Sequence, residues 1–472
     1  MTDGLLIRNA HAIMTGESGS SARSTATDLR VAQGLITEMG CGLAASPSDR
    51  VLDANDCVIY PGWVNTHHHL FQSLLKGVPS GIDLTLGPWL QAVPFRYRGA
   101  FHEGQLRLAA RIGLVELMLS GCTTVADHHY IFHSRLGYDP AEILFDEADK
   151  LGLRFMLLRG GATLTRSLEV DDPQHIPPET LDGMVGEVER TVARFHQRGP
   201  RAMRRVALAP TTVNVSVRTE ELAPLAQAAR RMGIPLHSHM SESVATIEQC
   251  RASFGRLPIE YLAEHEWLGP DVWLAHLVHL SESERRLLGE SGTGMAHCPQ
   301  SNARLADGVA PAPALAALGA QVGLGVDGAA SNEAADMLSE AHMCWLVHRA
   351  LAGSATRPQP EGRGERGADI VTAERVLHWG SSSGARMLGF EGVGSLAVGQ
   401  AADFAVYDLD QPRYFGLHDP AIGPIVSGGR PRLQWLLVNG RVIVEDDAVR
   451  GLDMAALRAE ANMAVRTLMQ GV

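Results

Sequence analysis

Short apolar runs rich in β-branched residues alternate with longer amphipathic stretches through the middle of the chain. The runs predict eight strands, at residues 58–66, 123–128, 154–160, 206–213, 235–239, 272–277, 292–297 and 322–327. Helical spacing is clearest at residues 105–119, 141–151, 220–232 and 282–288. Because strands that alternate with helices form parallel sheets with right-handed crossovers, this pattern predicts an α/β fold, a (β/α)8 TIM barrel.

Both ends of the chain show short alternating runs broken by turn residues instead. The run at residues 435–444 contains Asn439-Gly440, a strong signal for a two-residue hairpin. We therefore expect residues 1–58 and 390–472 to form one small, discontinuous β-sandwich domain beside a barrel of residues 59–389. The segment 358–367, rich in Gly, Pro and Arg, is expected to be an exposed loop.

Composition narrows the class of protein. Hydrophobic residues make up 45% of the chain and charged residues 20%, as in ordinary soluble globular proteins. No apolar run approaches the roughly 20 residues that span a bilayer, and the start lacks a secretory pattern, so we expect a cytoplasmic protein with no membrane partner. A formal net charge of -12 without a basic cluster argues against binding nucleic acid. Six cysteines without a CxxC pair indicate neither a disulfide framework nor a cysteine-type zinc site.

Histidines gather at the predicted carboxyl ends of strands, where the loops of a barrel share one face. The run Pro61-Gly-Trp-Val-Asn-Thr-His-His-His-Leu70 ends strand one. Since alternate residues of a strand point the same way, His67 and His69 can face one point while His68 faces away. Later strand ends add His237, His239, Glu242, His276, His297 and Asp327. One such His alone is more often structural, but three imidazoles and a carboxylate together could bind a catalytic divalent metal.

Several runs make nearly the whole chain resemble the aromatic-base deaminases of the amidohydrolase superfamily. They are PGWVNTHHHLFQSLLKG, LRGGAT, HSHMSE, AHCPQSN and GVDGAASNEAADM. The resemblance is greatest to the isoxanthopterin (pterin) deaminases, with the 8-oxoguanine deaminases as near relatives. It implies a hydrolase that releases ammonia from an amino-substituted fused heteroaromatic ring, such as isoxanthopterin or a related pterin. It also implies a small-molecule substrate and a homo-oligomer.

The resemblance further implies one divalent metal per subunit, Zn2+ before Fe2+. The implied ligands are His67, His69, His239 and Asp327. Binuclear members of the superfamily bridge two metals with a carboxylated Lys or a Glu at the end of strand four, but this chain has Ala209-Pro-Thr-Thr-Val213 there. Its two lysines, Lys76 and Lys150, lie at no predicted strand end. We therefore expect a mononuclear site.

Three residues are implied to carry the chemistry. By resemblance, Glu242 delivers a proton to the ring nitrogen, and Asp327 moves a proton from the attacking water to the departing amine. His276 would orient and polarise the nucleophile. Glu242 has an alternative role as a solvated carboxylate at a helix start, and Asp327 as the cap of its turn. For His297, support of the site, substrate contact and a plain structural hydrogen bond remain open.

Candidates for substrate recognition lie on the same predicted face of the barrel. They are Gln72, Trp89, Arg159, Ser301 and Asn302. Gln72 and Trp89 suit a flat ring, through an amide and an apolar face, although Trp89 also suits the core of the long insertion at residues 77–99. Arg159 could hold a carbonyl or carboxylate substituent, with an internal ion pair as the alternative.

Other functions remain open at this point. Within the same scaffold they are an 8-oxoguanine or guanine-type deaminase and a triazine hydrolase that removes chloride or an alkylamine. Outside enzymes, the chain could be an inactive barrel that serves as a scaffold. The presence of every implied ligand together with Glu242 and His276 speaks against a scaffold, which needs no proton carriers.

Overall fold

The structure is a computed structural model that describes residues 4–133, 135–165, 176–353 and 370–470. The loop expected at residues 358–367 lies outside the described residues. Among the helices of the described ranges, none has both the length and the apolar character needed to cross a membrane.

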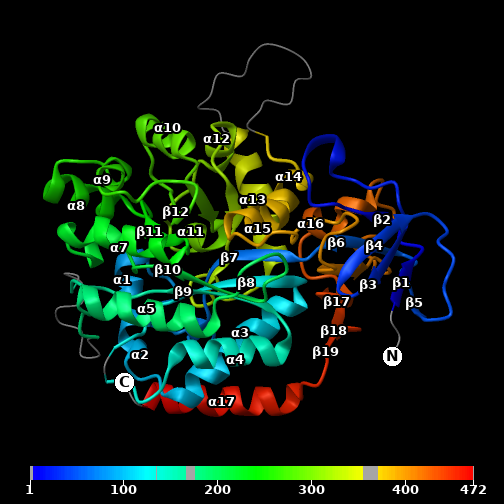
Figure 1. Ribbon diagram of the computed structural model, residues 1–472, viewed down its shortest axis with the longest axis horizontal. Helices are drawn as coiled ribbons and strands as arrows, with labels where there is room; N and C mark the ends of the chain where they lie inside the picture. The colour runs from blue at the N-terminus through cyan, green and yellow to red at the C-terminus, as the bar shows by residue number, and fades with distance from the viewer. Residues whose placement is uncertain (1–3, 134, 166–175, 354–369, 471–472) are drawn as a thin grey trace.

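A parallel sheet forms the centre of the larger unit (Figure 1). Its strands are β7 Trp63–His69, β8 Cys122–His129, β9 Arg154–Arg159, β10 Arg204–Leu208, β11 Leu236–Met240, β12 Val272–His276, β13 Gly294–His297, β14 Val322–Leu324 and β15 Asp327–Gly328. They pair in chain order from β7 to β14, and β15 returns to β7 through the pair Asp327 and His68. The eighth strand is thus divided in two, and it closes the (β/α)8 barrel that the sequence pattern predicts.

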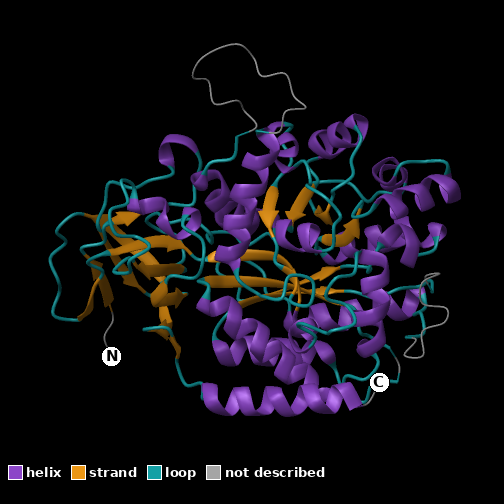
Figure 2. Ribbon diagram, turned by 180° about the vertical axis from the view of Figure 1, so that it is seen from behind, coloured by secondary structure: helices purple, strands orange, loops and turns teal. Residues whose placement is uncertain are grey.

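Helices cover the outside of this sheet (Figure 2). The helices of eight or more residues that follow barrel strands are α3 Glu103–Leu119, α4 Pro140–Leu151, α5 Leu181–Phe195, α7 Thr219–Met232, α8 Val244–Phe254, α10 Glu282–Ser291 and α13 Met337–Ala352. Shorter helices of this unit are η2 Leu70–Leu74, α1 Leu86–Leu90, η3 Gln91–Phe95, α2 Arg96–Arg98, α6 Val213–Ser216, α9 Pro258–Glu264, α11 Pro299–Arg304, α12 Ala312–Ala317, α14 Ala373–His378, η5 Trp379–Ser383 and α15 Gly384–Met387. The four helices predicted from the spacing of apolar residues correspond to α3, α4, α7 and α10.

The first predicted strand, residues 58–66, is in fact two strands that belong to different sheets. β6 Cys57–Pro61 pairs with β16 Phe404–Asp408 outside the barrel, and β7 begins at Trp63. Gly62 lies between them, where an added Cβ would approach the side chain of Thr123 to 2.2 Å. The chain therefore changes sheets at a point where only glycine leaves enough room for the neighbouring strand.

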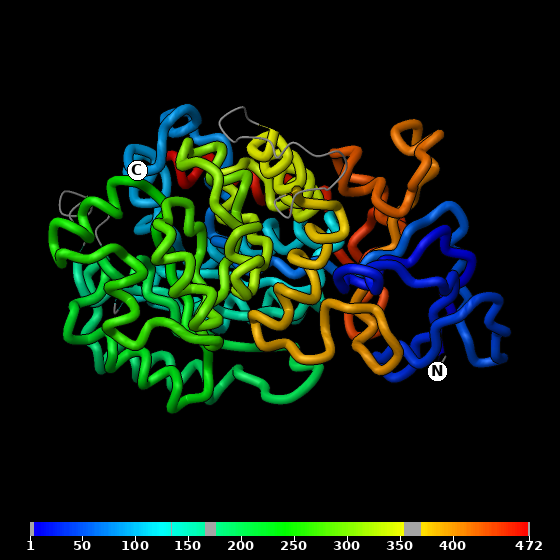
Figure 3. Tube along the Cα trace, turned by 90° about the horizontal axis from the view of Figure 1, so that it is seen from above, coloured from blue at the N-terminus to red at the C-terminus, as the bar shows by residue number. Residues whose placement is uncertain are grey.

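Both ends of the chain build two smaller sheets beside the barrel (Figure 3). One contains β1 Gly4–Arg8, β3 Asp28–Ala32, β4 Leu35–Gly40 and β5 Asp49–Asp53. The other contains β2 Ala12–Ile13, β6, β16, β17 Arg432–Val438, β18 Arg441–Glu445 and β19 Ala448–Val449. In the predicted hairpin, Val438 pairs with Arg441 across Asn439 and Gly440, whose φ values of 48° and 75° are those of a type I′ turn.

The last helix, α17 Met454–Gln470, leaves these sheets and packs along α3 (Figure 1). Arg111 Nη1 of α3 lies 3.7 Å from Glu460 Oε2 of α17. We therefore propose one β domain made from both chain ends. Its amino-terminal part passes into the barrel at Gly62, and its carboxyl-terminal helix packs back on the barrel.

A buried ion pair joins the barrel to the smaller sheets. Arg154, at the start of β9, is fully buried; its Nε lies 2.5 Å from Asp403 Oδ2 and its Nη2 3.1 Å from Asp403 Oδ1. Asp403 also accepts a hydrogen bond of 2.6 Å from the backbone N–H of Asn439. Each buried charge is therefore compensated by the other at the junction of the two units, and removing one would leave the other without a counter-ion.

Replacing Arg154 with Met is expected to lower the free energy of unfolding by about 3–5 kcal/mol, because Asp403 stays buried without its counter-ion. Chemical denaturation followed by circular dichroism measures the change. Arg204→Met is the matched control, since Arg204 pairs with Asp149 while both are about one-third exposed, and it should cost less than about 1 kcal/mol. Equal losses in the two variants would show that burial of the Arg154 pair has no special weight.

Candidate active site

Three histidines turn their Nε2 atoms toward one point at the carboxyl ends of β7 and β11. His69 Nε2 and His239 Nε2 are 3.1 Å apart. Their other ring nitrogens point outward: His69 Nδ1 donates to the carbonyl of His128 at 2.7 Å, and His239 Nδ1 donates to that of Thr211 at 2.5 Å. Because a carbonyl can only accept, Nδ1 carries the proton and the Nε2 lone pair is free.

His67 also carries its proton on Nδ1, and here the hydrogen-bond acceptor is a second histidine, His237. His237 Nδ1 donates to the carbonyl of Trp273 at 3.0 Å, so His237 Nε2 is an acceptor. His67 Nδ1 lies 2.9 Å from that atom and donates to it. The Nε2 atom of His67 is buried and has no hydrogen-bond partner among the described residues. All three imidazoles thus offer a lone pair to the interior of the site.

Asp327 adds a carboxylate to these imidazoles. Its Oδ1 lies 3.3 Å from His67 Nε2 and 3.2 Å from His69 Nε2. The residue has a φ of 58°, in the left-handed region that Asp tolerates better than most side chains. His68, which faces away from the site, holds this turn, because its Nδ1 lies 2.5 Å from the carbonyl oxygen of Asp327.

The donor atoms fit a divalent metal. Two overlapping sets lie within 4.8 Å, and they are His67, His69, His128 and His239, and His67, His239, His276 and Asp327. Burial lowers the pKa of His67 to about 3 and that of His239 well below its ordinary value, so both rings are neutral at neutral pH. Neutral imidazole nitrogens with one carboxylate are typical ligands of such metals. His128 was not among the ligands expected from the sequence; it lies on β8, the strand that pairs with β7.

The end of β10 offers no bridge for a second metal among the described residues. Thr211 there gives its carbonyl to His239, and no carboxylate follows the strand. Lys76 pairs with Glu116 at 2.8 Å and Lys150 with Asp146 at 2.7 Å, both away from this point. These contacts are compatible with the single metal expected from the sequence.

Two further side chains with proton chemistry lie beside the carboxylate. His276 Nε2 is 3.5 Å from Glu242 Oε1. His276 Nδ1 lies 2.9 Å from Asn302 Oδ1 and donates to it, which turns Nε2 toward the site. His276 has a φ of 74°, and this left-handed bend ends β12. The arrangement places an acid, an imidazole and Asp327 around one pocket.

Helix α11 supports two of these groups from behind. Ser301 Oγ donates to Asp327 Oδ2 at 2.6 Å, and Asn302 holds His276 as described. Both side chains are buried, and neither lines the pocket. The structure thus brings Ser301 to Asp327 and Asn302 to His276, whereas the sequence suggested that both contact substrate.

Asn302→Ala is expected to lower kcat by about 10- to 100-fold with little change in KM, because His276 loses the acceptor that fixes its ring. Steady-state kinetics measures both constants. Asn302→Asp, which keeps an acceptor oxygen, should recover part of the loss, and Asn55→Ala, at an exposed turn, should have no effect. A rise in KM alone would instead indicate direct contact of Asn302 with substrate.

The pocket at these histidines has polar and apolar walls. It is lined by His69, Gln72, Leu86, Trp89, Leu90, Phe95, Tyr130, Thr211, Thr212, His239, Glu242, His276 and Asp327. Gln72 Oε1 and Trp89 Nε1 are buried and have no hydrogen-bond partner within the described part of the chain. A Cβ at Gly328 would lie 1.9 Å from Gln72 Oε1, so this glycine makes room for the amide beside Asp327. Together with His276 Nε2, Gln72 Oε1 and Trp89 Nε1 are unpartnered polar atoms of residues that line the pocket, within the part of the chain that the structure describes.

This geometry agrees with a match to known proteins. The model of the amidohydrolase family matches residues 58–443 of the chain. The chain belongs to the amidohydrolase family. The resemblance inferred from its HxH, HSHMSE and GVDGAASNE motifs is confirmed, and the protein is a hydrolase of this family.

Two curated relatives are similar to this amidohydrolase over nearly their whole length. An isoxanthopterin deaminase from an unknown prokaryotic organism is 53% identical over 471 residues, covering 99% of this chain and 98% of the relative. An 8-oxoguanine deaminase from Pseudomonas aeruginosa is 38% identical, covering 98% and 99%. Among solved structures, atrazine chlorohydrolase from Arthrobacter aurescens complexed with zinc superimposes with a TM-score of 0.88 at 28% identity, covering 98% of this chain and 100% of that one.

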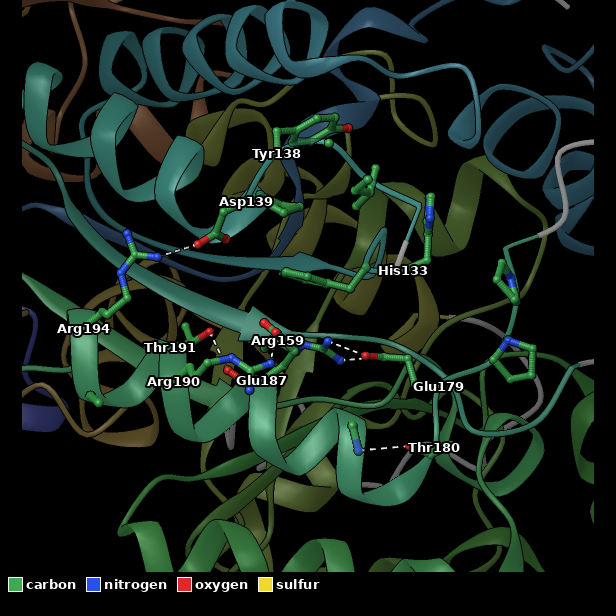
Figure 4. Close-up of a pocket in the computed structure, with 18 residues that line it drawn as sticks. His133, Tyr138, Asp139, Arg159, Glu179, Thr180, Glu187, Arg190, Thr191 and Arg194 are labelled. Atoms are coloured by element: carbon green, nitrogen blue, oxygen red, sulfur yellow. Dashed lines mark hydrogen bonds and ion pairs between the residues drawn. The ribbon is translucent and has the colours of Figure 1, made fainter.

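Arg159 lies outside the pocket of this amidohydrolase. Its Nη1 and Nη2 each lie 2.6 Å from an oxygen of Glu179 (Figure 4). The guanidinium carbon lies 4.3 Å from the ring centre of Phe132. These residues border a separate cavity of about 990 Å³ beside α5. The structure thus shows the internal ion pair that was the alternative for Arg159, and it does not bring Arg159 to Gln72 and Trp89.

His297 also lies outside the pocket. Its Nε2 is 3.0 Å from His348 Nε2 of α13, and both rings are buried. Burial, and after it the neighbouring His348, lowers the pKa of His297 well below its ordinary value, so the ring is neutral. Three roles were left open for His297 by the sequence. Its contact with His348 favours the structural hydrogen bond.

Sequence reasoning missed several walls of the pocket. Tyr130 directly follows β8, and Thr211 and Thr212 lie in the loop between β10 and α6, so a search of these loops for aromatic and hydroxyl groups would have found them. Leu86, Leu90 and Phe95 belong to the insertion after β7, whose sequence shows no pattern that distinguishes pocket walls from core.

Proposed function

We propose that this amidohydrolase is a deaminase that removes the amino group of isoxanthopterin and related pterins by hydrolysis, with release of ammonia. The observation that carries the proposal is the 53% identity to an isoxanthopterin deaminase over 99% of the chain. The pocket supports it, because an acid, an imidazole and a carboxylate surround the place where a ring would lie.

We propose one Zn2+ per subunit, held by His67, His69, His239 and Asp327. Support comes from the inward Nε2 atoms, the absence of a bridging anion among the described residues after β10, and the zinc complex of the similar chlorohydrolase. When bound, such a metal supplies hydroxide at neutral pH, since it lowers the pKa of water from about 15.7 to about 7.

The reaction forms a C–O bond at the ring carbon and breaks its C–N bond, and protons must reach both the ring nitrogen and the leaving amine. We assign the first proton to Glu242, whose carboxyl lines the pocket. Asp327 takes the proton of the attacking water and passes it to the amine, while Ser301 holds its far oxygen in place. His276, with Nδ1 fixed by Asn302, polarises the nucleophile through Nε2.

Recognition of the ring falls to Gln72 and Trp89. The pyrimidine edge of a pterin carries a ring N–H beside a carbonyl, which requires one acceptor and one donor. Gln72 Oε1 and Trp89 Nε1 are a buried acceptor and a buried donor without other partners in the described residues. Leaving either one unpaired costs affinity, which favours substrates with this edge.

An 8-oxopurine deaminase is the second candidate, because an 8-oxopurine presents the same edge and the 8-oxoguanine deaminase is 38% identical. Ammonia release from the purified, zinc-loaded protein separates the two. Isoxanthopterin, pterin-6-carboxylate, 8-oxoguanine, guanine and a chlorinated triazine are offered side by side. We expect kcat/KM for isoxanthopterin to exceed that for 8-oxoguanine by about 100-fold or more. The reverse order would assign the purine, and no release from any aminated ring would refute a deaminase.

A further inference from the structure

The insertion at residues 77–99 forms one wall of the pocket. Trp89 from α1 and Phe95 from η3 reach the lining, together with Leu86 and Leu90. All the atoms that position substrate on this side therefore depend on how the insertion is held against the barrel.

Two charged side chains hold the start of this insertion by its backbone. Arg304 donates from Nη1 to the carbonyl of Leu84 at 3.2 Å and from Nη2 to that of Gly81 at 3.0 Å. Glu333 Oε2 accepts the backbone N–H of Gly77 at 2.5 Å. The two side chains also contact each other, with Arg304 Nη2 3.4 Å from Glu333 Oε1. Three backbone points of the insertion are thus fixed by one ion pair.

The same ion pair is attached to the catalytic groups. Arg304 is the last residue of α11, which carries Ser301 and Asn302. Glu333 lies in the loop that follows β15, which begins with Asp327. The same two side chains therefore connect the insertion that lines the pocket to the segments that carry Ser301, Asn302 and Asp327.

We propose that Arg304 and Glu333 are positioning residues that set substrate affinity by fixing the insertion over the catalytic groups, an inference that rests on the proposed deaminase function. Both side chains are only partly buried, with exposed fractions of 16% and 32%, so neither belongs to the core that the barrel needs in order to fold. Loosening the anchors leaves Trp89 less well ordered before substrate binds, so ordering it costs part of the binding free energy and affinity falls.

The test compares Arg304→Gln, Glu333→Ala and the double variant, assayed with isoxanthopterin. Each single change is expected to raise KM by about 10- to 100-fold and to leave kcat within about threefold, because it removes binding rather than proton transfer. The double variant should resemble the worse single one, since both side chains hold the same segment. Arg256→Gln, which breaks the exposed pair of Arg256 with Glu264, is the matched control and should match the wild type.

Hydrogen exchange supplies a readout that does not depend on turnover. Backbone amides of residues 77–90 should exchange faster in Arg304→Gln and Glu333→Ala, while those of the barrel strands keep their rates. If the wild type shows no activity, the deaminase proposal fails while exchange still tests the anchors. Unchanged exchange at residues 77–90, or a fall in kcat at constant KM, would overturn the role assigned to this ion pair.

Discussion

Glu242→Gln is expected to lower kcat by about 10²- to 10⁴-fold, with metal content and fold unchanged. Gln keeps the size of Glu, but its amide is too weak an acid to transfer a proton to the ring nitrogen. Because Glu242 is not among the grouped metal donors, zinc should stay bound. Ammonia release with isoxanthopterin, together with zinc measured by atomic emission, tests both parts. Glu248→Gln, at an exposed position of the adjacent helix α8, is the matched control and should be fully active.

Two outcomes of this experiment carry different conclusions. Loss of zinc along with activity would mean that the Glu242 carboxylate helps to hold the metal, and its role as proton carrier would have to be withdrawn. Turnover within about threefold of the wild type would assign the proton to another group. A protein that serves only as a scaffold would show no turnover before the substitution either, so the wild-type rate decides that alternative first.

The alternation of side chains along a strand made part of the site predictable. Residues two apart on β7 face the same way, so His67 and His69 converge and His68 turns outward, as their hydrogen bonds show. The same local rule says nothing about partners that come from another strand or loop. Arg159 ends β9 as expected, but Glu179 arrives from 20 residues further along the chain and holds its guanidinium. Sequence pattern could not reveal that pairing, because no periodicity marks the segment that carries Glu179.

The direction of a helix decides which groups its side chains contact, and the sequence pattern did not predict the direction of α11. Ser301 and Asn302 follow the end of β13 closely enough to suggest contact with substrate. Helix α11 instead turns them toward Asp327 and His276, and the substrate side is taken by the insertion after β7. The pattern of eight strands predicts which strand ends meet at one face of the barrel. The path of each loop instead depends on contacts between residues far apart in the sequence, such as the hydrogen bond from Arg304 to the carbonyl of Gly81.

Removal of the metal is expected to abolish turnover, and one equivalent of Zn2+ per chain should restore it. Without the metal, water near the site keeps a pKa of about 15.7 rather than about 7, so hydroxide is lost as the nucleophile. The metal also stabilises the native state, by about 4 kcal/mol when its free concentration is 1,000 times its dissociation constant. The melting temperature should therefore fall on stripping with dipicolinate and recover on titration with zinc.

His239→Ala gives the matched genetic test of this site. The ring reaches the site from β11, while His67 and His69, the other imidazoles of the proposed ligand set, come from β7, so its loss removes one ligand without disturbing the HxH strand. The variant should bind zinc weakly, show no turnover and melt at the same temperature with or without added zinc. His11→Ala, at an exposed position of the small β domain, should keep the full response. Restoration that needs two equivalents of zinc per chain would contradict the mononuclear site, and full activity of the stripped protein would refute the dependence on metal.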